Sequence, residues 1–377
     1  MSRVHLGDVA IEHKETCKED KSMYPIVGLE HLTPEQITLQ NWDLNTENTF
    51  TKVFRKGNIL FGRRRAYLKK AAVAPFDGIC SGDITVIEAK EDKIIPELLP
   101  FVIQNDDLFD FAVGKSAGSL SPRVKWTHLQ NYEFELPDKQ KQHELAKVLW
   151  AIEDTRKSYQ QLIKRTDELV KSQFIELFGE LGSDDKGWGL TTLGQCCELN
   201  PKRPRDINDE TMVSFVPMPA VSEDGKIDCS DIRPYKEVRK GFTYFAENDV
   251  LFAKITPCME NGKGAVARGL ENGIGSGSTE FHVLRPIAGK SNPYWLYIIT
   301  MFDTFRVGAR KVMTGTGGQL RVPIGYLNDY PISLPPIELQ NSFEEFVHQS
   351  DKSKFELNRA LDELTATYKQ IIKDNLG

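Results

Sequence analysis

Hydrophobic residues recur at helical spacing along two long stretches of the chain. The first stretch runs from Gln140 to Phe178 and the second from Ile337 to Leu376, and neither contains proline or glycine. Apolar positions three and four residues apart form one stripe along a helix, and many of the other residues are good helix formers. Each stretch therefore predicts one helix of about 39 residues, which would be roughly 58 Å long.

The two apolar stripes share one heptad register after a shift of 198 positions. They are wider than a minimal two-stranded seam, so we predict that the helices pair and still present an apolar face to partner subunits. The alternative, that each helix packs only against its own domain, stays open because some seam positions are polar (Thr155, Thr166, Ser350, Ser353). The candidate pairing and partner-binding residues are Leu145, Leu149, Ile152, Leu162, Ile163, Phe343, Val347, Leu357, Leu361 and Leu364.

The segments outside these helices contain short β-type runs that are broken by glycine and asparagine turns. NILFG and DITVI are predicted strands of the first segment, as are DVLFAKI and TEFHVL of the second. A helical segment follows near Pro96–Phe111 and again near Pro293–Val307, and the glycine-rich run 273–277 is predicted to be a loop between strands. The fold class is α+β, with domains at 1–137 and 188–335, a first helix and linker at 138–187, and a second helix at 336–377.

The sequence of the second half of the chain is similar to that of the first half, at an offset that grows from 187 to 198 residues. The segment FRKGNILFGR from Phe54 corresponds to FAENDVLFAK from Phe245, and RVKWTHLQNYEFELP from Arg123 corresponds to RVPIGYLNDYPISLPP from Arg321. The matching order of two domains and two helices predicts an internal pseudo-two-fold repeat.

Composition and charge narrow the class of protein. The chain has 377 residues, 40% hydrophobic and 27% charged, which is typical of a soluble globular protein. It lacks both a run of about 20 apolar residues and the apolar core of a signal peptide, so we expect a cytoplasmic protein without membrane contact. The formal net charge of −6 is an objection to nucleic-acid binding.

The local distribution of charge removes that objection, because DNA phosphates interact with nearby charges and not with the net charge of the whole chain. Residues 51–76, 112–132 and 304–328 contain several Lys and Arg but no Asp or Glu, and the acids are expected to lie away from these loops. A solvated charged face is the alternative interpretation. The candidate DNA-binding residues are Arg63, Arg64, Arg65, Lys69, Lys115, Ser116, Ser119 and Arg123 in the first repeat, and Lys254, Thr256, Lys263, Arg310, Lys311, Thr314, Thr316, Gln319 and Arg321 in the second.

Two of the basic segments are also rich in small polar residues. KSAGSLS begins at Lys115 and KVMTGTGGQ begins at Lys311. Backbone amides, hydroxyls and a glutamine can form hydrogen bonds with phosphates and base edges. Glycine permits a close approach of the main chain to DNA. A tight turn between a helix and a strand is the alternative for residues 315–318, and the two interpretations are compatible.

The sequence contains none of the familiar motifs for catalysis or cofactor binding. There is no phosphate-binding GxxxxGK[ST] loop, no nucleophile elbow and no aminomethyltransferase motif. The six cysteines do not have metal-binding spacing. We therefore predict no catalytic residue, no metal site and no cofactor bound by this chain.

The stretches LGD, DVLFAKI…GKGAVA, GSGSTEFHVLRP and LPPIELQ, together with the order of domains and helices, resemble the specificity subunit of type I restriction–modification systems. The resemblance implies that each domain reads one half of a split double-stranded DNA site, and that the helices form an antiparallel coiled coil that sets the spacing. It also implies two methyltransferase subunits and restriction (translocase) subunits as partners, which carry S-adenosylmethionine, ATP and Mg²⁺. The first domain begins almost at residue 1 and the second helix ends at Leu376, so extra segments at either end are expected to be short or absent.

Two other classes remain as alternatives. A helical scaffold whose domains bind protein would show no salt-dependent affinity for DNA. A self-contained restriction or modification enzyme would need the cofactor motifs that the sequence lacks.

Overall fold

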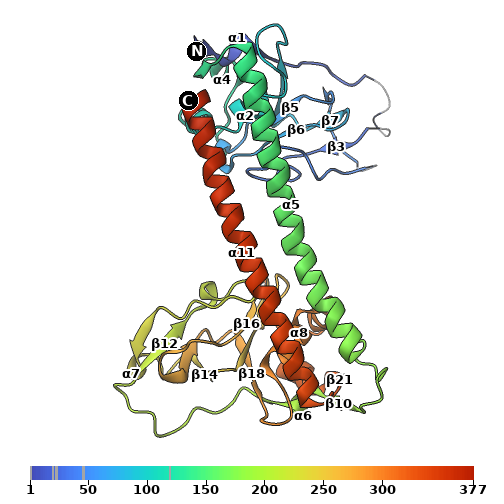
Figure 1. Cartoon of the computed structure of the whole chain (residues 1–377), viewed down its shortest axis with the longest axis vertical. Coiled ribbons are helices and arrows are strands. Elements are labelled where there is room, and N and C mark those ends of the chain that lie inside the picture. Colours follow the sequence, from blue (N-terminus) through green and yellow to red (C-terminus); the bar gives the residue numbers. More distant parts are fainter. Residues whose placement is uncertain (1, 19–20, 22–23, 45–46, 119) are drawn as a thin grey trace. The chain divides into compact units, whose positions relative to one another are not determined.

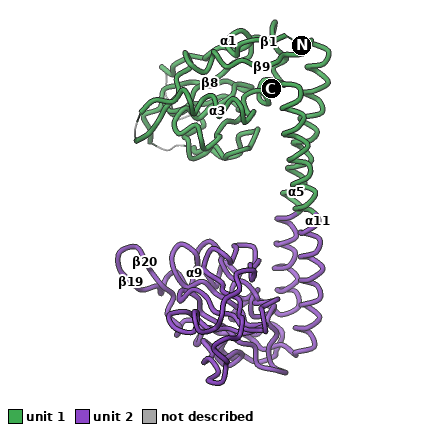
Figure 2. The backbone as a smooth tube through the Cα atoms, turned by 90° about the vertical axis from the view of Figure 1, so that its left-hand side faces the viewer, with its two compact units in different colours: residues 1–162, 357–377 green, residues 163–356 purple. Residues whose placement is uncertain are grey.

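The computed structural model describes residues 2–18, 21, 24–44, 47–118 and 120–377. They form two compact units, one of residues 1–162 and 357–377 and one of residues 163–356 (Figure 2). Each unit holds a globular domain and one section of each long helix. Within the described ranges, none of the helices has both the length and the hydrophobicity that crossing a membrane requires.

Two small sheets form the centre of the first domain. One has the order β2-β8-β5-β6 and is antiparallel throughout, and the other has the order β3-β7-β4. Phe54, Leu60 and Cys80 join both sheets in one buried cluster. The strands are β2 (Ala10–Glu12), β3 (Ile26–Val27), β4 (Lys52–Phe54), β5 (Ile59–Gly62), β6 (Ala71–Val73), β7 (Gly78–Cys80) and β8 (Ile84–Ala89).

Short helices and one strand pair complete this domain. The helical segment expected near Pro96–Phe111 is two helices, because the side chain of Asn105 accepts the backbone N–H of Asp107 (3.1 Å) and starts a new helix there. The strand pair joins the beginning of the domain to its end. These elements are β1 (Ser2–His5), α1 (Leu6–Val9), η2 (Ala66–Leu68), α2 (Leu99–Ile103), α3 (Asp106–Gly114), α4 (Trp126–Leu129) and β9 (Glu133–Leu136).

The second domain repeats the first, which confirms the internal repeat. Its sheets have the orders β11-β18-β15-β16 and β13-β12-β17-β14, and the strand pair β10-β21 again joins the beginning of the domain to its end. The strands are β10 (Leu190–Thr192), β11 (Cys197–Leu199), β12 (Met212–Val216), β13 (Ile232–Pro234), β14 (Thr243–Ala246), β15 (Val250–Ala253), β16 (Gly264–Val266), β17 (Ile274–Gly277), β18 (Phe281–Pro286) and β21 (Pro331–Ser333).

Some helices of the second domain repeat those of the first, at the start of the domain and after its last sheet strand. The segment expected at Pro293–Val307 is again two helices, since the backbone of Phe302 is extended between them. The helices are α6 (Leu193–Cys196), η3 (Met218–Ala220), α7 (Tyr235–Val238), η4 (Glu271–Gly273), α8 (Pro293–Met301), α9 (Asp303–Lys311) and α10 (Ile324–Asp329).

Residues 274–277 of the glycine-rich run form strand β17 and Gly273 ends η4, so the prediction of a loop was wrong. Strand β17 lies inside its sheet, parallel to β12 and antiparallel to β14. A Cβ on Gly275 would lie 2.0 Å from the ring of Phe245, and one on Gly277 would lie 2.2 Å from the carbonyl oxygen of Val216. The glycines are therefore required by close packing inside the sheet.

Both long helices are continuous, as the sequence predicted (Figure 1). Helix α5 (Lys139–Phe178) and helix α11 (Ile337–Leu376) have 40 residues each. The carboxylate of Asp138 accepts the N–H of Lys141 (2.9 Å) at the start of α5, and Gly179 ends the helix with a φ of 81°. Two prolines precede α11. They cost no helical hydrogen bond there, because the N–H groups at the start of a helix have no acceptor within the helix.

In each unit the two helices pack against each other and against the domain. In the first unit, Leu149 of α5 and Ile372 of α11 lie in the domain core. In the second unit, Phe343 of α11 meets Phe174 of α5 with ring centroids 5.6 Å apart. The ion pair of Lys354 with Asp167 (2.9 Å) lies further along, so the helices are antiparallel.

The candidate pairing residues differ in burial. Leu145, Leu149, Phe343 and Val347 are buried, whereas Leu162 is exposed. The remaining candidates are half-buried, namely Ile152, Ile163, Leu357, Leu361 and Leu364. The apolar stripe of the two helices is therefore buried in part. The domain boundaries inferred from the sequence stay a prediction.

Candidate nucleic-acid interface

Two basic segments that are distant in the sequence lie side by side in the first unit. The backbone N–H of Arg65 donates to the carbonyl of Pro122 (2.9 Å), and that of Val124 donates to the carbonyl of Arg63 (3.0 Å). Arg64 and Arg123 are partners in an antiparallel bridge. We call Arg63, Arg64, Arg65 and Arg123 the first basic surface.

The carboxylate of Asp83 pairs with two arginines of this surface, with Arg64 at 3.5 Å and more closely with Arg123. Asp83 accepts two hydrogen bonds from Arg123, at 2.6 Å from Nε and 3.2 Å from Nη2. The hydrogen bond from Arg123 holds the pKa of Asp83 below its usual value, so the carboxylate stays charged at neutral pH. Arg123 remains 44% exposed, and only two of its five N–H groups are used in this pair.

The second unit contains the same arrangement. The N–H of Thr256 donates to Leu320 and that of Val322 donates to Lys254, each at 2.9 Å. Arg321 is bound through two atoms by Glu280, at 2.9 and 2.8 Å, and the pKa of this carboxyl is lowered by Arg321. Burial lowers the pKa of the neighbouring Lys254. We call Lys254, Thr256 and Arg321 the second basic surface.

The expectation that acids lie away from the basic loops was wrong. Asp83 and Glu280 each lie directly against an arginine of a basic surface. Each acid immediately precedes an equivalent strand, β8 or β18, and the two acids are 197 residues apart, within the range of repeat offsets. This recurrence was present in the sequence and could have identified both residues.

A strand hairpin extends the second basic surface. Strands β19 (Thr314–Thr316) and β20 (Gln319–Arg321) pair in antiparallel register around Gly317 and Gly318, whose φ values are 63° and 77°. The tight turn predicted between a helix and a strand therefore lies between two strands, where positive φ at both positions favours glycine. Thr314, Thr316 and Gln319 are exposed.

Arg310 and Lys311 precede the hairpin. Both are exposed and lie in the last turn of α9. Positive side chains at a helix carboxyl end also stabilise the helix dipole, so their position has a structural explanation as well.

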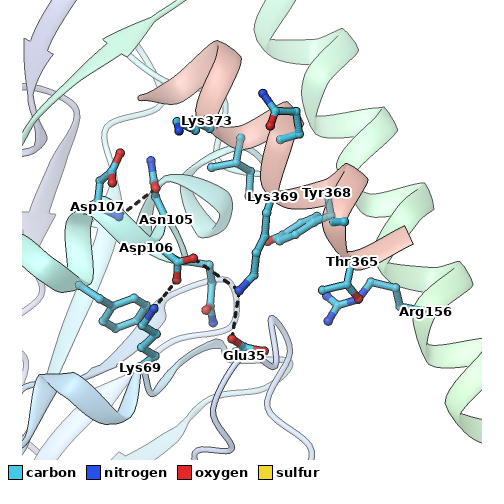
Figure 3. Close-up of a pocket in the computed structure, with 15 residues that line it drawn as sticks. Glu35, Lys69, Asn105, Asp106, Asp107, Arg156, Thr365, Tyr368, Lys369 and Lys373 are labelled. Carbon is cyan, nitrogen blue, oxygen red and sulfur yellow. Dashed lines mark hydrogen bonds and ion pairs between the residues drawn. The ribbon is translucent and has the colours of Figure 1, made fainter. Parts of the chain in front are cut away.

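Other candidates have contacts outside these surfaces. Lys69 binds Asp106 (2.6 Å), which also pairs with Lys369 (3.4 Å), around a cavity of about 310 Å³ in the first unit (Figure 3). Ser116 donates to the carbonyl of Ala112 (2.8 Å). The remaining three candidates are Lys115, which is exposed, Lys263, which is half-buried, and Ser119, which lies outside the described residues.

The described part of the chain offers no evident metal centre. No three His, Cys, Asp or Glu side chains of the described residues are grouped so that they could hold a metal ion. Cys80, Cys196 and Cys197 are buried, and burial raises the pKa of each thiol. Buried thiols of this kind are poor nucleophiles.

The chain belongs to the family described as the type I restriction modification DNA specificity domain, whose profile matches residues 3–165 and 185–365. The two matches correspond to the two repeats. The domain that defines this family therefore occurs twice in the chain.

Curated relatives and solved structures agree with this family. The chain is 38% identical to the specificity subunit of the Escherichia coli type I restriction enzyme EcoAI over 227 residues, which is 56% of this chain and 37% of that protein. It is 38% identical to the EcoEI specificity subunit of Escherichia coli over 202 residues, 53% of this chain and 33% of that protein. The chain thus spans about a third of the length of these relatives.

Two solved structures show the same fold. The type I restriction–modification S subunit from M. genitalium is 12% identical, with a TM-score of 0.55 over 100% of this chain and 96% of that chain. A chain from a study of complex assembly and conformational transition of a type I R-M system is 20% identical, with a TM-score of 0.56 over 99% of this chain and 97% of that chain. At these identities the likeness concerns the fold alone.

Proposed function

We propose that the chain is the non-catalytic specificity subunit of a type I restriction–modification system, and that each domain reads one half of a split, asymmetric DNA site. The observation that carries this proposal is the recurrence of an acid-bound arginine on a basic surface in both domains. Family membership supports DNA as the ligand. The isolated chain is expected to transfer no methyl group from S-adenosylmethionine to DNA.

The bound arginines suit the reading of bases. A guanidinium held by a carboxylate loses little conformational freedom when it contacts DNA, and arginine bound to guanine is the commonest specific contact in the major groove. The major groove also admits a two-stranded ribbon such as β19-β20. The loops differ between the repeats, with Arg63-Arg64-Arg65 against Lys254-Ile255-Thr256, so the two half-sites are expected to differ.

Replacing Arg321 with alanine is expected to weaken binding to the cognate site by about tenfold to a hundredfold, since a bidentate base contact discriminates by about 1–3 kcal/mol. The loss should be confined to one position of the half-site read by the second domain. Binding and modification would be measured on sites with every base substituted in turn, at one salt concentration.

The matched control is Arg233→Ala. Arg233 also forms a bidentate pair, with Asp231 (3.0 and 2.6 Å), and is 40% exposed, but it lies on β13. Equal losses in the two variants, or no loss for Arg321→Ala, would contradict the assignment of Arg321 to base reading.

The long helices are proposed to bind two methyltransferase subunits, which restriction subunits then join. Each unit has solvent-exposed apolar residues on the long helices. Val148 and Leu162 are 46% and 45% exposed in the first unit, and Leu169 and Phe355 are 52% and 61% exposed in the second. Exposed aliphatic and aromatic side chains on one helix face are typical of a protein interface. In this proposal the partners carry S-adenosylmethionine, ATP and Mg²⁺, and the complex acts in the cytoplasm.

Replacing Phe355 with aspartate is expected to weaken binding of the methyltransferase subunit by tenfold or more, because buried aromatic residues are frequent hot spots of interfaces. The free chain should keep its thermal stability, since Phe355 is 61% exposed. Titration of labelled chain with purified methyltransferase subunit measures the effect.

Lys352→Asp, at another exposed position of α11, is the control. If Phe355→Asp and Lys352→Asp bind the subunit equally well, Phe355 has no place in the interface.

A further inference from the structure

Two buried glutamines occupy equivalent places at the starts of the two long helices. Gln142 is the fourth residue of α5 and Gln340 is the fourth residue of α11, 198 positions later. Their side chains are almost completely buried, with 2% and 0% exposure. Glutamine is rarely buried to this extent, so the repeat of this burial indicates a specific role.

Each amide joins the helix start to two segments of the same unit. Gln142 accepts the N–H of Ile95 at Oε1 (2.9 Å) and donates from Nε2 to the carbonyl of Pro137 (2.8 Å). Ile95 lies just before α2, and Pro137 directly follows β9. The side chain therefore links the helix to the segment before α2 and to the end of the closing strand pair.

Gln340 makes the equivalent contacts in the second unit. Its Oε1 accepts the N–H of Asn292 (2.9 Å), and its Nε2 donates to the carbonyls of Pro335 (2.9 Å) and Lys290 (3.0 Å). Asn292 in turn caps α8 by accepting the N–H of Tyr294 (2.8 Å). The same three segments are thus joined in both repeats.

An ion pair between helix and domain also recurs, but it is more exposed. Lys369 of α11 pairs with Asp106 (3.4 Å), and Lys171 of α5 pairs with Asp303 (3.9 Å). These lysines are 47% and 38% exposed, and ion pairs of this kind contribute little. Water does not compete for the buried amide hydrogen bonds, so the glutamines fix the direction of the helix more firmly.

We propose that Gln142 and Gln340 are positioning residues that hold the direction in which each long helix leaves its domain, and thereby fix the number of base pairs between the two half-sites. The inference rests on the proposed function of the chain as a reader of split sites. A helix of 40 residues is about 60 Å long, so a tilt of about 3° at one end moves the other end by about 3 Å. That displacement is close to the rise of one base pair, about 3.4 Å.

The test uses the full chain assembled with its methyltransferase subunits. The split site of the wild-type complex is first mapped by sequencing of modified DNA, and its half-sites are then placed at the native spacing and at one or two base pairs more or less. For Gln340→Ala and Gln142→Ala, modification at the altered spacings relative to the native spacing is expected to rise about tenfold, which corresponds to about 1.4 kcal/mol. The bases of both half-sites should stay the same.

Two further variants separate positioning from stability. Gln340→Met fills a similar volume without hydrogen bonds and serves if the alanine variant does not fold. Gln349→Ala changes an exposed glutamine of the same helix and should keep the sharp spacing of the wild type.

The possible outcomes differ clearly. Lower modification at every spacing with an unchanged preference, or a change in the half-site bases, would overturn the positioning role. Broadening by Gln349→Ala to the same degree would do so too. A wild-type complex that modifies no split sequence would remove the proposed function itself, and this result appears before any variant is made.

Discussion

Exchange of residues 188–335 for the corresponding domain of another specificity subunit is expected to change one half-site completely and leave the other unchanged. The second basic surface and its hairpin lie entirely within this segment. The strand pair β10-β21 brings the two ends of the segment together, with Leu190 opposite Ser333 and Thr192 opposite Pro331. A domain whose ends are adjacent can be replaced as a block without a new path for the chain.

The replaced domain must still pack against the long helices. Trp295 and Leu296 of α8 share a buried cluster with Phe174 and Phe343 of the helices, so the donor domain should carry similar side chains there. Sequencing of DNA modified by the hybrid complex gives both half-sites and their spacing in one experiment.

The reciprocal exchange of residues 1–137 is the control. Strands β1 and β9 join the ends of this domain as β10 and β21 join those of the second. It should change only the other half-site. If either hybrid alters both half-sites, or neither, the domains do not read DNA independently.

The helices and the repeat were predictable from the sequence because they depend on local or recurring features. A proline-free stretch with apolar residues at helical spacing determines a helix almost without tertiary information. The repeat multiplies the evidence, since β5 and β15 follow from the matching runs NILFG and DVLFA. The breaks at Asn105 and Phe302 were missed because an apolar segment that is buried on all sides hides the end of one helix and the start of the next.

The candidate sites were predictable only in part because their key contacts join distant residues. The adjacency of the two basic segments in each unit depends on isolated backbone bridges between distant residues and not on the local sequence. Asp83 and Arg123 are 40 positions apart, and Glu280 and Arg321 are 41 apart. A stretch of sequence without acidic residues therefore does not predict which carboxylates contact it in the folded protein. The buried glutamines were missed for the same reason, as their partners are backbone groups.

Replacing Phe343 with alanine is expected to lower the free energy of unfolding of the second unit by about 3–5 kcal/mol, the usual range for a buried phenylalanine. Phe343 has 0% exposure, and its ring meets those of Phe174 and Phe178 at centroid distances of 5.6 and 5.3 Å. The alanine would leave a cavity at the point where both helices meet the domain core. Urea unfolding followed by fluorescence and circular dichroism measures the loss.

The matched control is Phe355→Ala on the same helix. Phe355 is 61% exposed, so its removal should change the free energy of unfolding by no more than about 0.5 kcal/mol. Similar losses in the two variants would mean that Phe343 is not buried between the helices in solution. If Phe343→Ala behaves as expected, modification directed by the second half-site should fall as the temperature approaches the lowered midpoint of unfolding. Because Phe355 is proposed to contact the methyltransferase subunit, this control is read by DNA binding of the free chain. That binding should persist, since the surface that reads DNA depends on the domain being folded against its helices.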